Sequence, residues 1–223
     1  KNKKLVGKFI MDHPKGYIGE LKYPKKNLIK FLELKQTRNY LKYIGVSLSK
    51  KDQTRRKFLN TYIRFENYNS RTYRLLSFLN ENLSFSFMRP NTKYLLRIFF
   101  EMEPSVKNFV KINNNEDLYT DISISNKDLN TANYLIRKVY NYFSEKPNFE
   151  KIKNINSRMI NDASHHMGGL IYPKIVDKNL KFNGLKKIYC CSSSVFPTSG
   201  SVNPTFTICA LALRLGIFLN SRK

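Results

Sequence analysis

The stretch SGSVNPTFTICALALRLG, residues 199–216, ends in a run with few polar side chains. Asn is favoured just before a helix, and Pro suits the first helical position, where its missing N–H costs nothing. Asn203 is therefore expected to cap a helix that continues through 206–219, with Arg214 as the exception to its apolar character. This helix is apolar all round but too short to span a bilayer, which takes about 20 residues, so other parts of a protein must cover it.

The start of this helix also has an electrostatic meaning. Free N–H groups and the positive end of the helix dipole, roughly half a unit charge, favour an anion or a charge that develops during a reaction. Taken alone, Asn203 fits either a simple helix cap or part of such a site, and the cap is the simpler interpretation.

A second stretch, SHHMGG at residues 164–169, contains two of the three histidines in the chain. Glycine lets the backbone approach a ligand closely, and His is the commonest general base near neutral pH. Adjacent strand residues point to opposite faces and only His13 remains as a further histidine, so no metal site is expected. His165 and His166 are either structural histidines or a base that activates a hydroxyl group.

The composition sets limits on the class of protein. With 223 residues, 41% of them hydrophobic, the chain is expected to fold around one core or two small ones. The net charge of +24 comes with lysines spread along the whole sequence, which indicates a compositional bias. Basic and aromatic residues alternate over 52–76, as on a single-strand binding face, but we favour solvated surface over nucleic-acid binding.

Cysteine usage points to a reducing compartment. An odd count of three, with two members adjacent, does not form a disulfide framework, so a cytoplasmic protein is expected. All three cysteines are expected to pack as small apolar residues. No apolar run of about 18 residues predicts a membrane span.

The pattern of apolar residues predicts an α+β chain, with an antiparallel sheet and flanking helices. Strands are expected at about 58–66, 93–103, 107–113 and 118–124, and in IYCCSSSVF at 188–196. Helices are expected at about 24–44 and 125–146, the second capped by Ser125 or Asn126 and closed by Pro147.

These stretches together resemble the C-terminal signature of the glucose-methanol-choline (GMC) flavoprotein oxidoreductases. SHHMGG is similar to the family's His-x-x-Gly motif, and residues 175–215 contain its Val-Asp turn, its Ser-Val-Phe-Pro-Thr-Ser-Gly and its Asn-Pro-Thr. LVGKFIMDHP at 5–14 resembles the segment that closes the FAD-binding half. FEMEPSVKNFVKINNNEDLYTDISI at 100–124 resembles the Glu-x-x-Pro strand pair.

The resemblance implies a domain division and an activity. Residues 1–20 would end the FAD-binding region, 21–184 would form the substrate-binding or cap domain, and 185–223 would return to the Rossmann-like FAD domain. The implied enzyme is an FAD-dependent alcohol or sugar dehydrogenase that acts on the CH–OH group of a small molecule. The alternative is a truncated, non-catalytic basic module that binds or supports other proteins.

The resemblance also implies roles for individual residues. His165 matches the base that takes the proton from the substrate hydroxyl as hydride leaves for the flavin. Asn203 matches the residue that hydrogen-bonds the same oxygen, and His166 would lie on the substrate side. The residues implied to contact FAD are Ser194, Val195, Pro204 and Thr205.

The chain departs from the family pattern at three points. Gly169 stands where members commonly have Thr, and Ser192 replaces a usual Asp beside FAD. The nine glycines include no Gly-x-Gly-x-x-Gly spacing, the loop in which a dinucleotide pyrophosphate sits on a helix N-terminus. A missing N-terminal FAD-binding half is therefore expected as the partner of this fragment, which alone is expected to be inactive.

Overall fold

The main sheet of the molecule is antiparallel and joins segments far apart in the sequence. The computed structural model describes residues 2–22, 35–36, 41–42, 44–67, 93–143, 148–149 and 165–222. Five strands pair in the order β10-β2-β7-β6-β5. Their bounds are Lys15–Lys22 (β2), Gly45–Ser47 (β5), Thr61–Asn67 (β6), Lys93–Phe100 (β7) and Asn148–Phe149 (β10). The strands predicted at 58–66 and 93–103 are confirmed, apart from their end residues.

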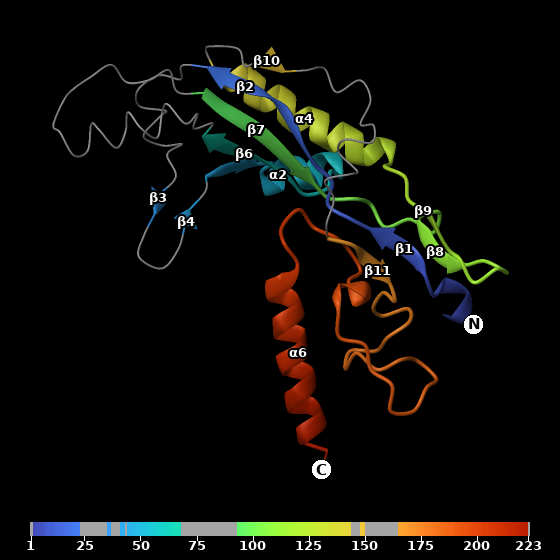
Figure 1. Ribbon diagram of the computed structural model, residues 1–223. Helices are drawn as coiled ribbons and strands as arrows, with labels where there is room; N and C mark the ends of the chain where they lie inside the picture. The colour runs from blue at the N-terminus through green and yellow to red at the C-terminus, as the bar shows by residue number, and fades with distance from the viewer. Residues whose placement is uncertain are drawn as a thin grey trace.

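Helix α4, Asn126–Tyr142, covers one face of this sheet (Figure 1). Ser125 caps it: its hydroxyl accepts the N–H of Asp128, whose carboxylate in turn accepts the N–H of Ser125. The helix predicted over 125–146 is confirmed from Asn126 to Tyr142 with Ser125 as its cap; it ends at Phe143, and Pro147, which was expected to close it, lies outside the described residues. Alternate side chains of β6 and β7 pack against the apolar side of α4 in the main core. The strands contribute Ile63, Phe65, Leu96 and Ile98, and the helix contributes Leu135 and Val139.

A second, four-stranded sheet continues from the first, because β1 and β2 are separated only by residues 12–14. Its order is β11-β1-β8-β9. The bounds are Lys8–Met11 (β1), Phe109–Ile112 (β8), Leu118–Asp121 (β9) and Met167–Gly169 (β11). The strands β8 and β9 confirm the predictions at 107–113 and 118–124, so the α+β class with antiparallel sheets is correct.

The segment between β11 and the last helix is mostly irregular. It holds two isolated bridges, Val176–Phe182 and Lys181–Tyr189, and a 3-10 helix η2 at Ser193–Val195. The strand predicted over 188–196 is therefore wrong except for one bridge residue. Its serines form local bonds that compete with a strand, such as the hydroxyl of Ser192 accepting the N–H of Ser194.

Three further predictions meet the structure only in part. The helix predicted over 24–44 lies mostly outside the described residues. The prediction is wrong at the two described pairs, Lys35–Gln36 (β3) and Leu41–Lys42 (β4), because they pair with each other as strands. A short helix, α2 at Lys50–Arg56, and a 3-10 helix, η1 at Asn2–Leu5, were not predicted. The domain division at 1–20, 21–184 and 185–223 stays a prediction.

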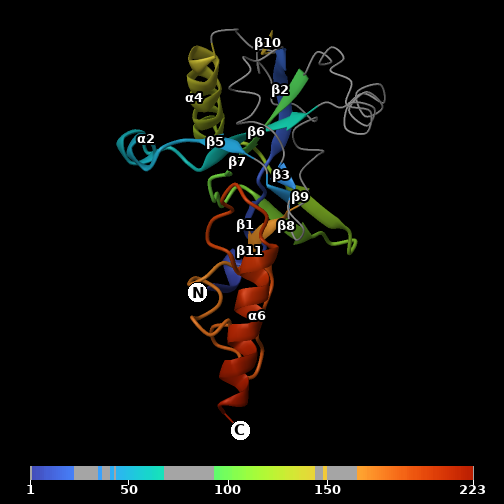
Figure 2. The ribbon, with the colours of Figure 1, turned by 90° about the vertical axis from the view of Figure 1, so that its left-hand side faces the viewer.

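The last helix, α6 at Thr205–Asn220, extends away from both sheets beside the irregular segment (Figures 1 and 2). None of its residues is buried, and the exposed fractions of Phe206, Leu213 and Ile217 are 85%, 69% and 64%. From α6, Leu211 and Leu215 pack against the small core of Val176, Leu180 and Val195. The apolar helix is as expected, but Cys209 is exposed, so its predicted packing is wrong in this chain.

We expect the 223-residue chain expressed alone to self-associate, since large exposed apolar patches drive association. Size-exclusion chromatography with light scattering measures this directly. Replacing Phe206, Leu213 and Ile217 together with Ser should increase the monomeric fraction, while Ser substitutions at exposed polar positions of α4 should not. A monodisperse wild-type monomer at tens of micromolar would contradict the expectation.

Candidate active site

The pairing of β1 with β11 brings together two dipeptides about 150 residues apart in the sequence. The strands run antiparallel, with Lys8 opposite Gly169 and Met11 opposite Met167. Asp12-His13 follows β1 directly, and His165-His166 directly precedes β11. The pairing therefore gathers all three histidines of the chain at one end of the ladder.

His13 and His165 form a face-to-face stack. Their ring centroids lie 4.5 Å apart and their planes differ by 9°. His13 is 1% exposed and His165 is half-buried. Both ring nitrogens of His13 are buried without a hydrogen-bond partner among the described residues.

The electrostatic state of His13 follows from this burial. Desolvation, followed by the charges of His165 and Lys15, lowers its pKa from 6.5 to about 4, although the carboxylate of Asp12 opposes the shift. His13 is therefore a neutral imidazole at neutral pH.

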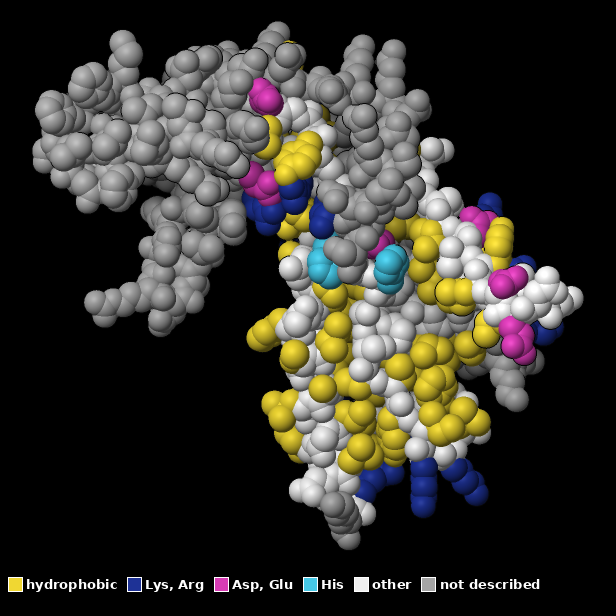
Figure 3. Space-filling model, viewed as in Figure 1, with side chains coloured by type: hydrophobic (Ala, Val, Ile, Leu, Met, Phe, Trp, Pro, Cys, Tyr) yellow, Lys and Arg dark blue, Asp and Glu magenta, His cyan; other side chains and the backbone are white. Residues whose placement is uncertain are grey.

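His166 has different surroundings from its neighbour. Its side chain is 70% exposed, and its Nε2 lies 3.6 Å from Oδ2 of Asp12, whose own side chain is only 5% exposed. The other oxygen of Asp12 accepts the backbone N–H of His13 at 2.7 Å. Histidine side chains reach the surface beside acidic and basic groups, between the main sheet and the part of the molecule that carries α6 (Figure 3).

The serine-rich segment before α6 is attached to this histidine strand. The hydroxyl of Ser193 donates to the carbonyl of His166 at 2.8 Å, and the N–H of Leu170 donates to the carbonyl of Ser194 at 3.0 Å. Val195 is buried, and its carbonyl accepts the N–H of Tyr172 at 3.0 Å. Ser194 and Val195, two of the expected cofactor residues, thus lie directly beside the histidine segment.

The beginning of α6 corrects one expectation. The cap position is Pro204, which is buried, and no side chain caps the helix. Asn203 is exposed and makes no side-chain hydrogen bond within the described residues, so the prediction that it caps α6 is wrong. The reason is that Pro204 already has helical dihedrals and its carbonyl accepts the N–H of Ile208, which moves the helix start one residue past Asn203.

The loop that leads to α6 is fixed to the main sheet by Ser199. This buried hydroxyl accepts the N–H of Met102 at 3.1 Å, just after β7 ends. Thr205, the first residue of α6, is exposed, and no hydrogen bond between described residues joins it or Asn203 to the histidines. The structure therefore attaches Ser193 to His166, and Ser194 and Val195 to the residues just after β11, and it links the loop before α6 to the sheet instead.

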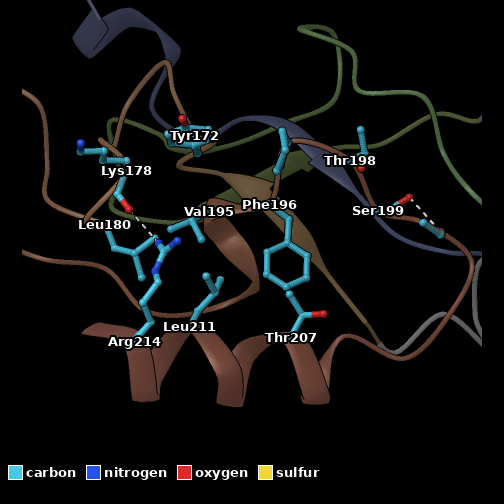
Figure 4. A pocket seen from close by; sticks show the side chains of 12 residues that line it. Tyr172, Lys178, Leu180, Val195, Phe196, Thr198, Ser199, Thr207, Leu211 and Arg214 are labelled. Carbon is cyan, nitrogen blue, oxygen red and sulfur yellow. Dashed lines mark hydrogen bonds between the residues drawn. The ribbon is translucent and has the colours of Figure 1, made fainter. Parts of the chain in front are cut away.

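Two cavities flank this region. One of about 470 Å³ lies between α6 and the segment around Val195–Gly200, where Thr207, Leu211 and Arg214 rise from the helix toward Val195 and Phe196 (Figure 4). Arg214 donates to the carbonyl of Lys178 at 2.7 Å across its edge. The second, of about 600 Å³, lies between the open face of the main sheet and Ser201-Val202, and its other lining residues are Gly45, Ser47, Gln53, Asn60, Thr61, Tyr62 and Arg64.

Sequence reasoning missed Asp12 and His13 as members of this site. The available signal was the resemblance of LVGKFIMDHP to a family segment, which marked the stretch without giving either residue a role. Within the described residues, no group of three or more His, Cys, Asp or Glu side chains could hold a metal ion. The site has the features of acid–base chemistry: a half-buried imidazole, a neutral one beside it and a buried carboxylate.

Comparisons with known proteins concern the family and the fold. The family model described as GMC oxidoreductase matches residues 104–212, from the end of β7 into α6. No curated protein sequence matches the chain.

Solved structures of the same fold are distant in sequence. Pyridoxine 4-oxidase from Mesorbium loti aligns with a TM-score of 0.51 and 14% identity, over 95% of this chain and 43% of that one. Two variants of formate oxidase from Aspergillus oryzae RIB40, studied for the effect of mutation on FAD modification, align with TM-scores of 0.51 at 14% and 15% identity. These alignments cover 98% of this chain and 48% of each oxidase, so the chain spans less than half the length of the structures it matches. Residues 104–212 of the chain are thus similar to the GMC oxidoreductase family, and the solved structures share its fold.

Proposed function

We propose that this chain is the substrate-facing part of an FAD-dependent oxidoreductase that oxidises a CH–OH group of a small alcohol or sugar. The observation that carries the proposal is the gathering of all three histidines and the buried Asp12 at the β1–β11 pair. An imidazole at such a position can accept a proton near neutral pH, which is the task of a base in alcohol oxidation.

His165 is the proposed catalytic base. It is half-buried, so its ring is held in place yet reachable, whereas His13 is enclosed and His166 is largely exposed. The proton leaves the substrate hydroxyl for a ring nitrogen of His165. The amide of Asn203 has no internal partner among the described residues, so it is available to hydrogen-bond the same substrate oxygen.

The chain fits FAD in part. The first N–H groups of α6 have no side-chain cap, and the positive end of the helix dipole lies with them, a donor set that suits the electron-rich edge of a flavin ring. Thr205, Pro204 and the backbone of Ser194 and Val195 are the residues proposed to lie beside the cofactor. FAD, when bound, would supply the hydride acceptor.

Binding of FAD would also need a segment of protein that this chain does not contain. No Gly-x-Gly-x-x-Gly spacing in this chain provides a site for the pyrophosphate, and α6 exposes large apolar side chains such as Phe206, Leu213 and Ile217. We propose that an upstream FAD-binding half supplies the glycine-rich loop and covers α6. This half would be the partner of the chain.

The cavity of about 600 Å³ is the proposed substrate pocket. Its lining combines hydroxyl and amide side chains with apolar surface, a set that suits an alcohol or sugar. It reaches Ser201-Val202, directly before the proposed active-site residue Asn203.

We propose that the protein is located in the cytoplasm. Within the described residues, no helix has the length and apolar character needed to cross a bilayer. Free cysteines support a cytoplasmic enzyme, and nucleic acid is not a proposed partner.

The test of the function starts with the coding DNA upstream of Lys1. An open frame with a glycine-rich strand-turn-helix supports the enzyme, and the complete protein should then show a flavin absorbance band that bleaches with a suitable alcohol. A well-folded complete protein without flavin would refute the proposal and favour the non-catalytic module.

A further inference from the structure

The ring of His13 occupies an unfavourable position for an imidazole. It is 1% exposed, and neither ring nitrogen has a partner among the described residues. A buried polar group without a hydrogen bond lowers stability, whereas an apolar ring of similar shape avoids the loss. A buried histidine that lowers stability in this way, next to a proposed catalytic base, indicates a role in that site.

We propose that His13 is a positioning residue for His165, and that its ring face fixes the plane of the base. The inference rests on the proposed function. The stack, with centroids 4.5 Å apart and planes within 9°, is the contact that carries it. The backbone of His13 is itself fixed, because its N–H donates to the buried carboxylate of Asp12 at 2.7 Å.

The geometry excludes a second role for His13 as a proton relay. A hydrogen bond to an imidazole nitrogen lies in the plane of its ring, whereas stacked rings meet face to face. The proton taken up by His165 therefore does not pass to His13 through the stack.

The neutral state of the His13 ring also supports its role beside His165. The groups that act on it are His165 across the stack, Asp12 beside it and Lys15 at the start of β2, and His166 lies on the far side of Asp12. Because two adjacent positive charges repel, a neutral His13 lets His165 become charged when it accepts the proton.

The test compares three variants of the complete flavin-containing enzyme. His13→Leu removes the ring, His13→Phe keeps a flat ring without nitrogens, and Phe58→Leu removes a ring from the distant Phe58–Tyr134 contact as a matched control. We expect His13→Leu to slow flavin reduction by about 10–10²-fold with little change in substrate affinity, because small misplacements of a reacting group reduce rate steeply. His13→Phe should recover most of this rate, and Phe58→Leu should change only the melting temperature.

A readout that needs no flavin chemistry accompanies the kinetics. In the unfolded chain His13 becomes protonated below about pH 6.5, whereas in the folded chain it becomes protonated only near pH 4, its lowered pKa. The free energy of unfolding therefore decreases as the pH falls from 6.5 to 4. The melting temperature of the wild type should therefore fall several degrees more than that of His13→Phe between pH 6.5 and pH 4.

The outcomes separate the inference from the proposed function. If His13→Leu lowers the melting temperature but leaves the reduction rate unchanged, the positioning role is wrong. Equal rate losses in His13→Leu and His13→Phe would also overturn it. If even His165→Ala reduces flavin normally, the proposed function fails, while the melting curves still report whether His13 is buried and neutral.

Discussion

Replacing His165 with Ala in the complete enzyme slows flavin reduction by the substrate about 10²–10⁴-fold, the usual contribution of a positioned acid or base. The flavin stays bound, because the proposed cofactor contacts come from the η2 segment and the start of α6. The reason for the loss is that water in place of the imidazole leaves the substrate hydroxyl without an oriented proton acceptor. Stopped-flow absorbance measures the rate, and thermal melting checks that the variant is folded.

Two neighbouring substitutions are the controls for this prediction. His166→Ala should cost much less, because its side chain is 70% exposed and its Nε2 lies 3.6 Å from Oδ2 of Asp12. Asn203→Ala should slow reduction to an intermediate degree without lowering the melting temperature, since Asn203 does not cap α6. If His166→Ala abolished reduction while His165→Ala reacted normally, the base would be misplaced by one residue.

Gly168→Ala in the same enzyme lowers the free energy of unfolding by about 3 kcal/mol or more, which is seen as a large decrease of the melting temperature. Gly168 has a φ of +87°, and an added Cβ would collide with the carbonyl oxygen of Phe9 on the paired strand. The positive φ alone costs about 1 kcal/mol, and relief of a backbone clash requires β1 and β11 to separate. The histidine pairing and the flavin reduction rate should be lost together with the strand pairing.

Gly184→Ala is the matched control for the clash. Gly184 has a similar φ of +80°, but nothing lies within 4 Å of an added Cβ. Its substitution should therefore cost only the conformational term, about 1 kcal/mol, and leave reduction unchanged. Equal melting temperatures for the two variants would contradict the close approach of β1 and β11.

Local sequence predicted the elements whose stabilising contacts are local. The capping box of Ser125 and Asp128 and the apolar periodicity of the following residues lie within one helix, so α4 could be predicted nearly in full. The strands β6 to β9 contain mostly aromatic and β-branched residues between polar turns, and they were found to within a few residues. The predicted strand over 188–196 failed because serine side chains bond to nearby backbone and favour a turn.

The sequence by itself determined the α+β class, the apolar character of α6 and the two motifs that resemble the GMC oxidoreductases. Only the tertiary structure decided which residues lie beside the histidine pair, since His13, which stacks on His165, and Asp12, which lies beside His166, are about 150 residues away and arrive through the pairing of β1 with β11. It also decided that the side chain of Asn203 does not cap α6. The buried Pro204 takes the cap position, and the hydrogen bond from Met102 to Ser199 fixes the loop before the helix. Contacts between distant segments depend on strand register and burial, and no pattern within either segment records them.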